Sequence, residues 1–171
     1  NHYIADGENR RIRKMTPAAE VTTLAGGNNE FGFLDAIVRD ASGDMYVCDS
    51  ENHMIKKLSA AGIITVVAGS GSAGSADGTG IYASVNGIFG MTMNGGQLYV
   101  SEFYNNKIRK VTPSGVVSTF AGSGSPFSID GNIGGVSGNY SSLPIQVTIT
   151  DNSAPLISCP ANITSPSTDT H

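Results

Sequence analysis

The histidines of this sequence are the first candidates for metal binding or proton transfer, and they lie far apart, at His2, His53 and His171. A metal centre needs several such ligands together, and a nucleophilic site needs a serine or cysteine supported by a histidine and an acid. No spacing of either kind occurs. The sequence therefore predicts no catalytic residue, no metal site and a protein that is not an enzyme.

A glycine-rich segment is the one candidate for a cofactor site. Gly69, Gly71 and Gly74 have the spacing of a dinucleotide-binding loop and follow a predicted strand. Residues 75–80 contain two further glycines, where a helix is needed to hold the pyrophosphate at its N-terminus. The start of the segment recurs at residues 121–125, followed by no third glycine. The segment is interpreted as a loop between repeats, and no cofactor is predicted apart from covalent glycans.

A repeat positions the remaining polar residues. Residues 3–14, 46–57 and 99–110 align without a gap, at spacings of 43 and then 53 residues. Each copy leads through a turn rich in Pro, Ala or Gly into a second shared stretch, at 21–26, 64–69 and 117–122. A further strand is predicted before the second and third copies, at 36–40 and 90–93. Each repeat thus supplies several short strands.

Four short strands per repeat are typical of a propeller blade, which buries its faces against neighbouring blades. We predict an all-β protein with about three blades of four antiparallel strands, an incomplete ring and a short β-sandwich-like C-terminal segment. The expected boundaries are 1–27 for a partial blade, 28–72 and 73–125 for two further blades, 126–150 for a partial blade or linker strand, and 151–171 for a different module.

The repeats resemble the NHL family over about residues 1–125, with weaker likeness to residue 150. Asn52, His53 and Met54 stand where that family has Asn-His-Leu, whereas the other two copies keep only the asparagine, at Asn9 and Asn105. The resemblance implies a β-propeller. Some similar propellers bind RNA on a basic face, and others are lyases that hold a metal in the central channel with several histidines.

Nine repeated positions are expected to be structural. They comprise the acid that ends a strand, the asparagine in the following turn and an isoleucine that faces an adjacent blade. The asparagine and aspartate side chains can bond nearby backbone amides and hold the reversal. These residues are Asp6, Asn9, Ile12, Asp49, Asn52, Ile55, Glu102, Asn105 and Ile108.

Basic residues are concentrated in the repeats, which makes an RNA-binding surface a legitimate alternative. Nine of the ten lie there: Arg10, Arg11, Arg13, Lys14, Lys56, Lys57, Lys107, Arg109 and Lys110. Against this alternative stand fourteen acidic residues, a net charge of −4 and a pI near 5.2. A solvated rim of salt-linked side chains is the preferred interpretation, and nucleic acid is not the expected partner.

The C-terminal residues belong to another pattern. Residues 151–164 resemble the opening of a HYR (hyalin repeat) module, an immunoglobulin-like extracellular domain, and include Cys159, whose disulfide partner is expected outside this sequence. N-glycosylation patterns start at Asn139 and Asn162. Together these features favour an extracellular or cell-surface location.

The function expected from the sequence is a non-catalytic extracellular scaffold or binding module that mediates adhesion or self-assembly into oligomers or fibres. Protein or glycan ligands and further copies of the chain are the expected partners. The alternatives are an intracellular propeller that binds RNA or protein and, with less support, a channel-centred lyase. No apolar run approaches the roughly 20 residues that span a bilayer.

Overall fold

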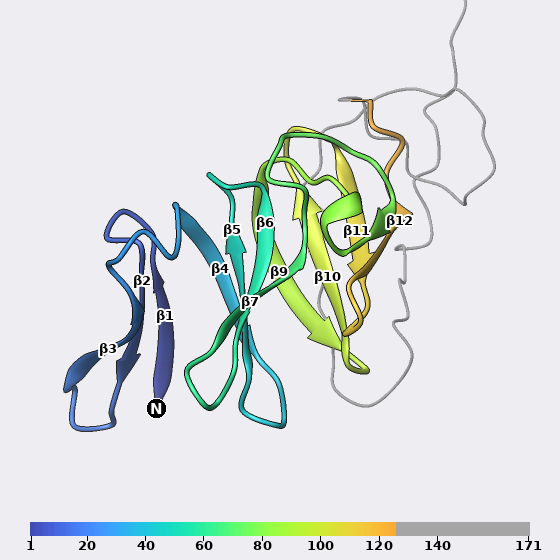
Figure 1. The fold of residues 1–171 in the computed structure, drawn as a ribbon. Coiled ribbons are helices and arrows are strands. Elements are labelled where there is room, and N and C mark those ends of the chain that lie inside the picture. The colour runs from blue at the N-terminus through green and yellow to red at the C-terminus, as the bar shows by residue number, and fades with distance from the viewer. Residues whose placement is uncertain (126–171) are drawn as a thin grey trace, which may run out of the picture. The chain divides into compact units, whose positions relative to one another are not determined.

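The structure is a computed structural model that describes residues 1–125, and these residues form an all-β fold of three antiparallel sheets (Figure 1). The first sheet contains β1 (His2–Asp6), β2 (Arg11–Met15) and β3 (Val21–Gly26) in chain order. The second contains β4 (Leu34–Arg39), β5 (Met45–Asp49), β6 (Met54–Leu58) and β7 (Ile64–Ala68), also in chain order.

The third sheet has the order β8, β12, β11, β10, β9. Its strands are β8 (Gly78–Thr79), β9 (Ile88–Asn94), β10 (Gln97–Glu102), β11 (Lys107–Val111) and β12 (Val116–Ala121), with a 3-10 turn, η1 (Gly80–Tyr82), between β8 and β9. The prediction of four strands per blade therefore holds for the second sheet. The first has three described strands and the third has five, because the segment before β9 adds β8 to the free edge of β12.

The three repeats pair their strands in the same register. Each repeated tyrosine lies opposite a repeated lysine, in the pairs Tyr3–Lys14, Tyr46–Lys57 and Tyr99–Lys110. Each central hairpin then makes a register shift at the same point of its next strand, directly after Ile12, Ile55 and Ile108. The identical register confirms that the sheets are successive propeller blades.

The repeated Ala-Gly pair has a geometric cause at this register shift. Gly69 has a φ of 109°, and a Cβ there would strike the carbonyl oxygen of His53. His53 itself has a φ of 51°, which closes the β5–β6 turn. Glycine is needed where the backbone has positive φ and another chain segment approaches closely. The equivalent pairs are Gly26 with Arg10 and Gly122 with Asn106.

Two hydrophobic cores lie between the sheets. Because successive side chains of a strand point to opposite faces of its sheet, one strand can contribute to both cores. On β5, Met45 and Val47 join the core shared with the first sheet, whereas Tyr46 and Cys48 join the core shared with the third. Contacts of β4 with β1 on one side and with β9 on the other hold the blades together. A blade in the middle of the described chain thus buries both faces.

Cys48 is a fully buried free thiol in the core between the second and third sheets. Burial raises the pKa of this thiol far above its ordinary value, and the negative charge of Asp35 adds to the shift. Because the thiolate is the reactive form, we expect Cys48 to resist a thiol reagent at pH 8 in the folded protein and to react at once in denaturant.

A Cys159→Ser variant leaves Cys48 as the single thiol for this measurement. Rapid labelling of the folded variant would show that the core between these sheets opens readily.

A search of residues 1–125 for a long apolar helix that could span a membrane finds none.

Candidate functional site

The predicted acid and asparagine positions come together in the first two blades. The Asn9 side-chain amide donates to the Asp6 carboxylate at 2.8 Å, and Asn52 donates to both oxygens of Asp49 at 3.0 and 2.9 Å. Each asparagine side chain thus bonds the carboxylate of the repeated acid, whereas the sequence predicts a bond to a nearby backbone amide. Asp49 also accepts the backbone N–H of Gly32 at 3.0 Å, which ties the turn to the segment before β4.

The third blade uses the same positions differently. Glu102 is buried and accepts the backbone N–H of Asn86 at 3.0 Å. Asn105 donates to the carbonyl oxygen of Gly74 at 2.7 Å and makes no bond to Glu102. The longer side chain of glutamate reaches past the turn, so the asparagine anchors the preceding loop instead.

The acid of the second blade also holds a buried lysine. Lys56 forms an ion pair of 2.8 Å with Asp49, and its ammonium donates to the carbonyl oxygen of Glu30 at 2.7 Å. The ring of Phe31 lies 5.5 Å from the same ammonium, measured to its centroid. These contacts connect β5, β6 and the loop before β4.

Arg109 occupies the equivalent position in the third blade and is fully buried. It forms ion pairs with Glu102 at 3.0 Å, also fully buried, and with the half-exposed Asp77 at 2.6 Å. The prediction of a solvated basic rim is therefore wrong for Lys56 and Arg109. Both are internal, and each is paired there with a buried carboxylate.

The three repeated isoleucines differ in burial according to their neighbours. Ile12 and Ile55 are completely buried in the cores between consecutive sheets. Ile108 is only half-buried, because the described residues place no further sheet against the third blade.

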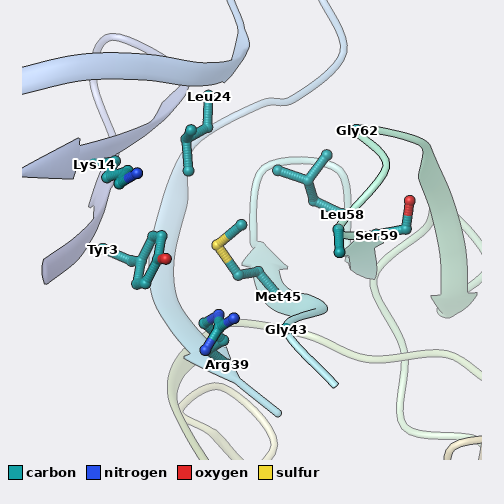
Figure 2. A pocket seen from close by; sticks show the side chains of 10 residues that line it. Tyr3, Lys14, Leu24, Arg39, Gly43, Met45, Leu58, Ser59 and Gly62 are labelled. Carbon is teal, nitrogen blue, oxygen red and sulfur yellow. The ribbon is translucent and has the colours of Figure 1, made fainter. Parts of the chain in front are cut away.

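A pocket of about 230 Å³ lies between the first and second sheets (Figure 2). Tyr3, Lys14 and Leu24 line it from the first sheet, and Arg39, Met45 and Leu58 line it from the second. Figure 2 shows Tyr3 and Lys14 facing Met45 and Leu58 across the open space. The remaining wall comes from Gly43, Ser59, Ala60 and Gly62, which belong to turns of the second blade.

The charged groups of this pocket are cations. Arg39 lies over the ring of Tyr3, with 5.5 Å from its guanidinium carbon to the ring centroid. No carboxylate lines the pocket, and within the described residues none forms an ion pair with Lys14 or Arg39. By contrast Lys57, the equivalent of Lys14, forms an ion pair of 2.9 Å with Asp44, and the hydrogen bond from Lys57 lowers the Asp44 pKa. Asn1 stands at the aligned position of the first blade.

A second, wider groove of about 460 Å³ runs along β1. Ile4, Ala5 and Asp6 line it together with the β1–β2 turn, and Phe33, Leu34 and Asp35 form the opposite wall. In the described chain β1 has a paired strand on only one side, whereas its equivalents β5 and β10 are paired on both. The groove therefore lies beside an open sheet edge.

Neither cavity follows from the residues singled out in the sequence. Their walls combine ends of strands from two repeats, and only a blade-by-blade alignment of charged positions could have indicated the cationic pocket. Over residues 1–125, no cluster of three or more His, Cys, Asp or Glu side chains has a geometry that could hold a metal ion.

Several predictions concern residues that the structure does not describe. Asn139, Asn162 and Cys159 lie outside the described residues, as do the expected partial blade or linker at 126–150 and the HYR-like segment at 151–171. They stay predictions.

Solved structures resemble the described fold. An auxiliary nutrient binding protein from Bacteroides ovatus aligns with a TM-score of 0.58 and 23% identity, over 70% of this chain and 33% of that chain. Virginiamycin B lyase from Staphylococcus aureus aligns with a TM-score of 0.52 and 15% identity, over 69% and 36%. A chain of a nidogen–laminin complex gives 0.52 and 19%, over 69% and 41%.

These likenesses support the β-propeller fold and, at such identities, the fold alone. The chain spans about a third of the length of the first solved structures that it matches. No known family profile and no curated protein matches the sequence.

Proposed function

We propose that this chain is a non-catalytic extracellular scaffold and binding module whose propeller blades mediate self-assembly or adhesion. The proposal rests mainly on one observation, an exposed blade face that carries an interface pattern. Tyr99, Ser101 and Ile108 of the third blade are equivalent to Tyr46, Cys48 and Ile55, which are buried against the next blade. In the third blade the same positions are half-buried or exposed.

The first blade offers a complementary surface. Ile4 is equivalent to Val47 and Val100, both fully buried against a preceding blade, but Ile4 itself is 39% exposed. In the described chain β1 is also an edge strand, with unpaired backbone groups beside the adjoining groove. Open strand edges and unpartnered sheet faces favour association with further strands. Docking of the third blade of one copy on the first blade of another would repeat an interface that the chain already contains twice.

Four of the ten basic residues are internal or paired with acids, which leaves fewer cations available for RNA. Lys56 and Arg109 are internal, and Lys57 is paired with Asp44. Arg10 pairs with Glu51 on the neighbouring blade. RNA binding requires several cations free to meet phosphates on one surface.

Fold neighbours include proteins whose names describe binding, such as the auxiliary nutrient binding protein, and a chain from a protein complex of nidogen and laminin.

The extracellular location rests on the sequence patterns at Asn139, Cys159 and Asn162. Expression in a eukaryotic secretory host should add glycan mass at both asparagines. An intact mass without glycans, together with salt-sensitive RNA binding, would favour the intracellular alternative, and a tightly bound metal would favour the lyase.

Self-assembly is tested by placing a long cation on the exposed blade face. We expect the chain to form concentration-dependent oligomers in sedimentation velocity runs, and we expect Ser101→Arg to shift them to monomers. Ser101 is already exposed, so the folded monomer tolerates the larger side chain. Ser42→Arg, in an exposed turn of the second blade, is the matched control and should leave the oligomers intact. A monomeric wild-type chain at all concentrations, or equal effects of both variants, would contradict self-assembly.

A further inference from the structure

The pocket between the first and second sheets differs from its counterpart between the second and third in a way that opens space. Arg39 ends β4 opposite Met45, and the equivalent residue in the third blade is Met93, opposite Leu98. Met93 packs against the core between those sheets, and so does Val67, the equivalent of Leu24. Leu24 is 38% exposed and Arg39 is exposed. Met93 and Val67 thus fill the interface between the second and third sheets, whereas Arg39 and Leu24 leave a pocket between the first and second.

The same differences concentrate positive charge. Lys14 keeps three ammonium donors, and Arg39 offers a planar fork of donors that matches a carboxylate. Neither has an ion-pair partner in the described part of the chain, although the protein has a net charge of −4. An acceptor for these donors must therefore come from solvent or from a ligand.

The floor of the pocket is apolar. Met45 and Leu58 are buried, and the ring of Tyr3 forms one wall (Figure 2). The volume of about 230 Å³ is below the range of about 300–1,000 Å³ for drug-sized ligands. The pocket suits a molecule with one apolar group of about the size of a single ring and one anionic head.

We propose that this pocket binds a small organic carboxylate. Its carboxylate lies between Lys14 and Arg39, and its apolar body rests on Met45 and Leu58. Every residue of the site comes from one chain, so binding is independent of the self-assembly proposed above. The failure of one proposal therefore leaves the other standing.

Calorimetric titration with benzoate tests this site, with benzyl alcohol and benzylammonium as neutral and cationic probes of the same shape. We expect saturable binding of benzoate alone, weakened by added salt. Lys14→Gln or Arg39→Gln should each weaken binding at least about tenfold, since a hydrogen bond to a charged group contributes about 1.5–3 kcal/mol. Lys110→Gln, at the equivalent position of the third blade outside the pocket, is the matched control and should leave affinity unchanged.

Protection of Cys48 from a thiol reagent, measured in the Cys159→Ser background, shows that each variant is folded. The proposal is overturned by an absence of saturable benzoate binding, by equal binding of benzyl alcohol, or by unchanged affinity in folded Lys14→Gln and Arg39→Gln. It is also overturned if inorganic phosphate binds as tightly as benzoate, because the apolar floor would then contribute nothing.

Discussion

Replacing Arg109 by methionine is expected to lower the free energy of unfolding by about 3–5 kcal/mol. The guanidinium is fully buried and is paired with the fully buried Glu102. Methionine fills similar volume but leaves the Glu102 carboxylate without its counter-charge, retaining one described backbone donor, the N–H of Asn86. The loss should appear as a lower midpoint in urea denaturation.

Two further variants identify the cause of that loss. Adding Glu102→Leu to Arg109→Met removes the unpaired charge and should recover most of the stability. Arg10→Met breaks the ion pair with Glu51, in which both side chains are about half exposed, and should cost no more than about 1 kcal/mol. A double variant no more stable than Arg109→Met alone would show that packing, rather than charge, sets the effect.

Gly69→Ala is expected to cost about 3 kcal/mol or more, the second large effect. The φ of 109° strains any residue with a Cβ, and the new methyl group meets the His53 carbonyl oxygen, which belongs to the backbone of the β5–β6 turn. Gly69 directly follows Ala68, the partner of Ile55 at the register shift, so relief of the contact has to move backbone atoms beside the paired strands. Urea denaturation again provides the measurement.

Gly62→Ala separates strain from contact. Gly62 has a φ of 85°, but a Cβ there would meet nothing within 4 Å. Only the conformational cost of about 1–2 kcal/mol is expected there. If both alanine variants lose the same stability, the close approach at Gly69 is not what requires glycine.

Much of the fold could be predicted because the repeats carry it locally. Tyr3, Tyr46 and Tyr99 mark equivalent strands, and their spacing from the paired lysines sets the hairpin register. The shared Ala-Gly pair was visible as a pattern, but its cause was not. Close approach of two backbones is a tertiary property, which a single sequence does not display.

Charge partners were the least predictable feature. Arg109 pairs with Asp77, which lies 32 positions earlier in the chain, and Lys56 bonds a backbone carbonyl at Glu30. Such partners are distant in sequence and depend on where the loops pack against a blade. The acids close to each cation in sequence predict a solvated rim instead. Arg39 is the one basic residue outside the repeated segments, so the repeat pattern does not indicate that it lines the pocket.

The central proposal is that one copy continues the blade array of another. It is tested most directly by cross-linking two copies at positions equivalent to a contact that the chain already makes between its own blades. Arg10 of the first blade pairs with Glu51 of the second at 3.0 Å. The equivalent residues on the two open blades are Asn106 and Glu8. In a Cys159→Ser background, Asn106→Cys and Glu8→Cys chains are therefore mixed and treated with a short bismaleimide.

We predict a covalent dimer in the mixture and no dimer from either variant alone. Arg10→Cys combined with Glu51→Cys should cross-link within one chain and so verify the reach of the reagent. A successful internal cross-link with a mixture that stays monomeric would contradict the assembly.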